Sequence, residues 1–163
     1  MVSEDIPRDY QRFIGMPAGE LLYHEEPMVL LGRVLSTTRE SACCECRCGA
    51  DNPFFLPGVG IPPWVAIEFM AQCVAVSAGA RAVLAGKRLP LGLLLGTMSL
   101  KLDHGCFQPG QDCRVESFTV LSDDLGMGAH QCRVLVNGRV AAEARLTAKE
   151  IDRGIGSVDF SIR

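Results

Sequence analysis

The chain has 163 residues, which is enough for one domain with its own core, and a second domain is not needed to bury its hydrophobic residues. Hydrophobic residues make up 48% and charged residues 21%, a composition typical of a globular protein and not of a disordered one. The net charge of −3 argues against nucleic acid as a partner. We expect one domain over residues 1–163, with its core at about residues 18–150.

The first nine residues have neither the basic start nor the apolar run of a signal peptide, so we expect a cytoplasmic protein with reduced cysteines. The apolar stretch at residues 64–80 is interrupted by Glu68 and Gln72 and is short for a bilayer span, so membrane insertion is not expected. The glycine-containing tail at residues 152–163 is expected to be peripheral.

The first predicted motif is a β-hairpin. An apolar run at residues 28–35 leads into the turn-like residues 36–40, and residues 41–48 then alternate along a second strand. This alternation places Cys44, Cys46 and Cys48 on one face of the strand, away from Glu45 and Arg47. We interpret these cysteines as small core residues, with a metal site and a redox or disulfide role as alternatives.

A long helix is predicted after the hairpin. Residues 51–63 form a loop rich in proline and glycine, Pro62 and Pro63 open the helix, and Gly86 ends it after about residue 85. Apolar residues surround this helix on nearly every side. Such a helix belongs in the middle of a fold, wrapped by other elements.

One carboxylate, Glu68, lies in this apolar helix, and it is the only one between Asn52 and Leu102. Burial raises the pKa of a carboxyl group, which suits a general acid. The structural alternative is that Glu68 accepts hydrogen bonds from a neighbouring loop or subunit. Gln72 lies one helical turn later on the same face, where it is expected to orient the carboxyl group or else to make a hydrogen bond at an interface or within the core.

Strands follow the helix, at residues 91–102, 113–121, 131–136 and 139–148. The last two flank Asn137-Gly138, a strong signal for a tight hairpin. One long buried helix wrapped by a curved antiparallel sheet satisfies all of these patterns. We therefore predict an α+β protein with the hotdog fold.

Three segments resemble the β-hydroxyacyl-acyl-carrier-protein dehydratases, a family of hotdog proteins. Residues 24–34 resemble the family's His-x-x-Pro motif before the first strand, residues 67–72 its helical Glu-x-Met-Ala-Gln motif, and residues 107–112 its Pro-Gly turn. Residues 53–55 and 62–64, Pro-Phe-Phe and Pro-Pro-Trp, resemble the branch of predicted dehydratases associated with aryl-polyene pathways.

This resemblance implies a hotdog homodimer, or a heterodimer with a related subunit. It also implies a substrate carried on the phosphopantetheine arm of an acyl carrier protein, with no metal and no other cofactor. Two positions depart from the family pattern. Phe54 stands where the typical enzymes carry a catalytic histidine, and Pro63 stands where they use a backbone N–H to polarise the thioester carbonyl. The donor is then expected to be Trp64 N–H or another amide of the first helical turn.

The leading hypothesis is a 3-hydroxyacyl-carrier-protein dehydratase with Glu68 as the acid and His24 as the base. The alternative for His24 is a structural role in fixing the N-terminal segment. Trp64, Phe54 and Phe55 are predicted to line the acyl path, or else to be core residues. Asn52 is predicted to contact a substrate oxygen, or else to be a turn residue. The rival hypotheses are an acyl thioesterase of the same fold and a noncatalytic partner that binds an acyl carrier or an active dehydratase.

Overall fold

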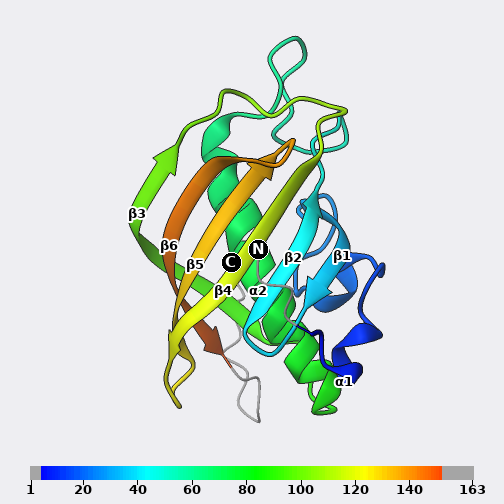
Figure 1. The fold of residues 1–163 in the computed structure, drawn as a ribbon, viewed down its shortest axis with the longest axis vertical. Helices are drawn as coiled ribbons and strands as arrows, with labels where there is room; N and C mark the ends of the chain where they lie inside the picture. Colours follow the sequence, from blue (N-terminus) through cyan, green and yellow to red (C-terminus); the bar gives the residue numbers. More distant parts are fainter. Residues whose placement is uncertain (1–4, 152–163) are drawn as a thin grey trace, which may run out of the picture.

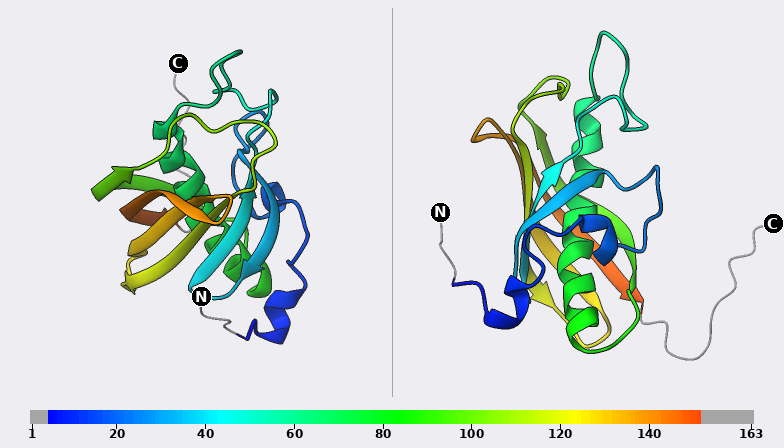
Figure 2. Two further views of the ribbon diagram at one scale, coloured as in Figure 1. Left: turned by 45° about the horizontal axis from the view of Figure 1, so that its top comes forward. Right: turned by 90° about the vertical axis from the view of Figure 1, so that its right-hand side faces the viewer.

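The computed structural model describes residues 5–151, in which a six-stranded antiparallel sheet curls around one long helix (Figure 1). The strand order is β1-β2-β4-β5-β6-β3, and the helix α2 lies along one face of the sheet (Figure 2). The strands are β1 Leu31–Thr37, β2 Ser41–Cys46, β3 Leu91–Leu102, β4 Cys113–Ser122, β5 Met127–Val136 and β6 Arg139–Ile151. The predicted α+β hotdog fold is confirmed.

The central helix begins and ends close to where its sequence predicts. A 3₁₀ turn at Pro63–Val65 leads into α2, Ala66–Leu84, and Gly86 follows with the positive φ of 65° that favours glycine after a helix. By length and composition alone, Pro63–Leu84 is apolar enough to cross a membrane, contrary to the expectation that it is too short. In the fold, however, the sheet and the N-terminal segment pack against it and account for its apolar character.

The core forms where α2 meets the sheet. Phe69 and Met70 of the helix are fully buried, and the ring of Phe69 meets that of Phe107 edge to face at a centroid distance of 5.6 Å. Cys44 is buried in the same core and Glu45 is exposed, as the alternation predicts. Cys46 is half-buried and ends β2, so Cys48, which is also buried, lies beyond the strand predicted to contain it. All eight cysteines are free thiols.

The segment before the first strand differs from the prediction. The strand β1 begins at Leu31 and not at residue 28, because residues 22–30 form an arm that runs along α2 instead of joining the sheet. We call residues 18–30 the N-terminal arm; it starts with the 3₁₀ turn Ala18–Leu21 and contains a cis peptide bond between Glu26 and Pro27. The short helix α1, Arg8–Gln11, also precedes it. Neither helical turn is predicted from the sequence.

The last hairpin forms around Asn137 and Gly138, whose φ angles of 51° and 78° are those of a type I′ turn. The strands on both sides extend beyond the predicted limits, since Met127 pairs with Lys149 although residues 127–130 lack a clear alternation. The tail predicted to be peripheral, residues 152–163, lies outside the described residues.

The strand β3 lies at one edge of the sheet. It pairs with β6 on one side and, among the described residues, with no strand on the other. Its apolar side chains are unusually exposed, with Leu95 at 54% and Met98 at 74%. An edge strand with unpaired backbone groups and exposed apolar side chains is a surface suited to strand pairing with another chain.

The Phe69–Phe107 contact predicts a large loss of stability on truncation. Phe107→Ala is expected to lower the free energy of unfolding by about 3–5 kcal/mol, because it empties a fully buried aromatic site. Urea denaturation at a fixed protein concentration measures the change. Val120→Ala, at a side chain that is 49% exposed, is the control and should change stability little. An equal loss in both variants would contradict this assignment of the core.

Candidate functional site

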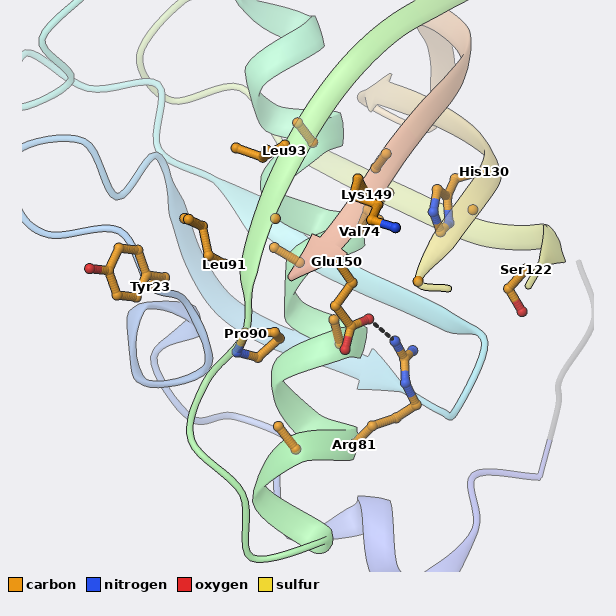
Figure 3. A pocket seen from close by; sticks show the side chains of 18 of the residues that line it. Tyr23, Val74, Arg81, Pro90, Leu91, Leu93, Ser122, His130, Lys149 and Glu150 are labelled. Carbon is orange, nitrogen blue, oxygen red and sulfur yellow. Dashed lines mark hydrogen bonds and ion pairs between the residues drawn. The ribbon is translucent and has the colours of Figure 1, made fainter. Parts of the chain in front are cut away.

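A groove of about 1250 Å³ runs between α2, β3 and the tips of β4 and β5. Small side chains of α2 form its floor, leucines of β3 form one wall, and polar groups lie at its ends. The main lining residues are Glu68, Ala71, Ala75, Ala78 and Arg81 from α2, Leu91, Leu93 and Leu94 from β3, and His24, His130 and Glu150. Figure 3 shows part of this lining.

Glu68 opens onto this groove from the first turn of α2. Its side chain is 33% exposed, so the carboxylate is not sealed in the core. Its Oε1 accepts a hydrogen bond of 2.8 Å from Gln72 Nε2, and His24 Nε2 lies 3.5 Å from the same oxygen. The structure thus brings together three of the residues that the sequence singles out.

Gln72 connects Glu68 to the N-terminal arm. The side chain is fully buried, and besides the bond to Glu68 its Nε2 donates to Met28 O at 2.7 Å. Its Oε1 accepts from Leu30 N at 2.9 Å. The helical spacing predicts the contact with Glu68, but the two bonds to the arm join residues more than forty positions apart and have no local signal.

The expectation that burial raises the pKa of Glu68 is wrong. The hydrogen-bonding interaction with His24 lowers the pKa of this carboxyl group, burial opposes that effect, and the hydrogen bond from Gln72 lowers the pKa further. The position in the first turn of α2 also favours the anion. Glu68 is therefore a carboxylate at neutral pH, not a protonated acid.

His24 comes to Glu68 from the N-terminal arm, and its side chain is 34% exposed in the groove. Because Nε2 faces the carboxylate, this nitrogen is the one that donates a proton toward it. The other ring nitrogen, Nδ1, is buried and has no hydrogen-bond partner among the described residues.

The other predicted site residues lie near the start of α2, and none of them lines the groove. Trp64 is 55% exposed and packs edge to face on Phe54, with 5.6 Å between ring centroids, and Phe55 is half-buried against the core. Asn52 is buried; its side-chain Nδ2 donates to Arg47 O and its side-chain Oδ1 accepts from Phe54 N. Asn52 therefore holds the loop, and the expected contact with a substrate oxygen is replaced by these two bonds.

The remaining histidines are placed elsewhere. His130 lies at the far end of the groove beside the Arg81–Glu150 ion pair (Figure 3), where burial lowers its pKa to about 4. Its Nδ1 lies 3.1 Å from Thr119 Oγ1. His104 packs on Phe107 with 5.6 Å between ring centroids. Of the three histidines, His24 is the one that faces Glu68.

A protein-family model described as ApeP dehydratase, of the ApeP-like family, matches residues 16–155. The chain belongs to the ApeP-like dehydratase family. The match includes the N-terminal arm, the central helix and all six strands. Comparison with curated protein sequences finds no match.

One solved structure agrees with membership of the ApeP-like family, and others share the fold alone. A chain of the dehydratase heterocomplex ApeI:P from Xenorhabdus doucetiae is 28% identical, with a TM-score of 0.76, covering 85% of this chain and 93% of that chain. A hypothetical thioesterase with coenzyme A from Streptococcus pneumoniae is 8% identical, with a TM-score of 0.57 and coverage of 74% and 85%. Cj0977, a virulence protein from Campylobacter jejuni, is 12% identical, with a TM-score of 0.60 and coverage of 95% and 99%. These last two share the fold.

The hydrogen bonds of Glu68 predict its titration. Its carboxyl group should titrate below the ordinary pKa of 4.5, and His24→Ala should raise its pKa because the largest cause of the shift is removed. Since the pKa is lower in the folded state, ionised Glu68 stabilises the fold above about pH 4.5, and this stabilisation is lost as the pH falls through the folded pKa.

Carbon-13 NMR of the side-chain carboxyl groups measures this pKa directly. His130→Asn is a matched control, because it removes an imidazole from the far end of the groove and should leave Glu68 unchanged. Titration of Glu68 above 4.5 in the wild-type protein would contradict the assignment.

Proposed function

We propose that this ApeP-like protein removes water from 3-hydroxyacyl thioesters to give trans-2-enoyl thioesters. The substrate is carried on the phosphopantetheine arm of an acyl carrier protein. The observation that carries this proposal is the carboxylate of Glu68, held by Gln72 and His24 at the end of an open groove. Membership of a dehydratase family gives independent support.

The lowered pKa of Glu68 suggests how a single carboxylate serves the reaction. As an anion, Glu68 accepts the proton that leaves C2 of the substrate. The protonated carboxyl group then gives that proton to the C3 hydroxyl, the C3–O bond breaks, and water departs as the C2–C3 double bond forms. The carboxylate is regenerated, so the protons balance without a second acid or base.

His24 supports this cycle from the side of the carboxylate. Its Nε2 lies 3.5 Å from Glu68 Oε1, where it orients the oxygen and stabilises the anion that begins and ends the cycle. This role replaces the sequence-based assignment of Glu68 as the resting acid and His24 as the base. It also means that a histidine at Phe54, where the typical enzymes carry one, is not required.

The charge that develops on the thioester oxygen needs a donor. Pro63 has no N–H, so we assign this role to Trp64 N–H at the start of the helix, assisted by the positive end of α2. In this arrangement the thioester lies toward the start of α2, and the apolar floor of the groove takes the acyl chain.

We further propose that the protein works as a dimer with a second hotdog subunit, either another copy or a related chain. The exposed apolar edge of β3 is the pairing surface, because its outer backbone groups have no partner among the described residues. The similarity to a chain of a dehydratase heterocomplex favours the related chain.

Substitution of Glu68 tests the reaction. Glu68→Gln keeps the shape of the side chain but cannot accept the C2 proton, so turnover should fall by about 10²–10⁴. His24→Ala should lower turnover less, because the carboxylate remains. The assay follows enoyl formation from a 3-hydroxyacyl-pantetheine or carrier-bound thioester, with the protein alone and with a related dehydratase subunit.

The outcomes separate the rival functions. Release of free thiol from a saturated acyl thioester, without enoyl product, would replace the dehydratase with a thioesterase. Enoyl formation that requires the second subunit and does not respond to Glu68→Gln would make this chain a noncatalytic partner. If Glu68→Gln and His24→Ala lower turnover equally, His24 would be assigned as the base.

Substitution on β3 tests the dimer. Leu95→Lys places a charge on the exposed edge and should convert the dimer to monomers, as measured by light scattering after size-exclusion chromatography. Leu125→Lys is the control, since it places the same charge on a side chain that is 75% exposed in the turn between β4 and β5. A dimer that survives Leu95→Lys but not Leu125→Lys would move the interface away from β3.

A further inference from the structure

The N-terminal arm contacts α2 at two points, on either side of His24. One is Gln72, which bonds to Met28 and Leu30 after the histidine. The other is Gly79, which lies two helical turns farther along α2 and meets the backbone of Leu21 before the histidine. His24 thus lies in a short span of chain that is fixed at both ends.

The contact at Gly79 is backbone against helix and leaves no room for a side chain. A Cβ atom at this position would lie 2.0 Å from the carbonyl oxygen of Leu21 and 2.9 Å from its carbonyl carbon. Ordinary contact requires about 3.5 Å, so the arm would have to retreat by roughly 1 Å or more. Backbone atoms cannot swing aside as the end of a flexible side chain does.

The sequence context makes this glycine unusual. Glycine destabilises a helix relative to alanine, and alanine occupies both neighbouring positions, Ala78 and Ala80. A glycine in a buried helical position therefore needs a packing reason, and the carbonyl of Leu21 supplies one.

A retreat at Leu21 is passed on toward His24. Leu21 and Leu22 are both buried, so the backbone there cannot shift without moving its packed neighbours, and one residue, Tyr23, separates them from His24. The separation of 3.5 Å between His24 Nε2 and Glu68 Oε1 is already at the long end of the hydrogen-bond range. A further displacement of roughly 1 Å would place the imidazole out of reach of the carboxylate.

We propose that Gly79 is a positioning residue, whose missing side chain lets the N-terminal arm seat on α2 and thereby holds His24 against Glu68. The part of this proposal that concerns turnover rests on the proposed function. The part that concerns geometry does not, since it predicts a change at Glu68 in the resting protein.

The test is Gly79→Ala, read first at Glu68. If the arm retreats, Glu68 loses its contact with His24, and its pKa should rise toward the ordinary 4.5 by the same amount as in His24→Ala. Carbon-13 NMR of the carboxyl groups measures the shift. The variant that combines both changes should show no further rise. Gly105→Ala is the control, because a Cβ there would meet no atom within 4 Å and should leave Glu68 unchanged.

A second variant keeps the proposal testable if Gly79→Ala fails to fold. Leu21→Ala leaves the backbone contact with Gly79 in place but removes the buried side chain that anchors this end of the arm, without introducing a clash in α2, and it should raise the pKa of Glu68 in the same direction. A folded Gly79→Ala or Leu21→Ala protein in which Glu68 titrates as in wild type would overturn the proposal.

Turnover separates this inference from the proposed function. Gly79→Ala should lower turnover by the same factor as His24→Ala, and the double variant should lose no more. A raised pKa of Glu68 with unchanged turnover would support the positioning role of Gly79 while removing His24 from the reaction.

Discussion

The candidate site depends on the hydrogen bonds made by the side-chain amide of Gln72. It is fully buried, and its two ends bond to Glu68 on the same helix and to Met28 and Leu30 on the N-terminal arm. A buried amide that lost these partners would leave polar groups unpaired, which is costly. One residue thus joins the carboxylate, the central helix and the segment that carries His24.

This arrangement explains how the ApeP-like chain keeps a carboxylate and an imidazole together without the loop histidine of typical dehydratases. The loop position is occupied by Phe54, which packs on Trp64 instead. The imidazole comes instead from His24, on an arm that the sheet does not include. The hydrogen bonds lower the pKa of Glu68 more than burial raises it, so this carboxyl group is ionised at neutral pH although much of it is buried.

The fold could be predicted because its signals are local. The prolines before the helix, the glycine after it and the Asn137-Gly138 turn each act over a few residues, and the structure places the elements accordingly. The N-terminal arm could not be predicted, because its apolar residues resemble a strand and are held by Gln72 more than forty positions away. The predicted direction of the Glu68 pKa shift is wrong for a similar reason. The apolar helix indicates burial, but no nearby residue in the sequence indicates the contact with His24, which is more than forty positions away.

The most direct test of the account is a crystal structure with a 3-hydroxyacyl-pantetheine analogue in which an amide replaces the thioester. C2 and the C3 hydroxyl of the bound analogue should lie beside the carboxylate of Glu68, with the acyl chain along the floor of the groove and His24 still against Oε1. An analogue bound away from Glu68, or a groove filled by a partner subunit with no path to the carboxylate, would contradict it.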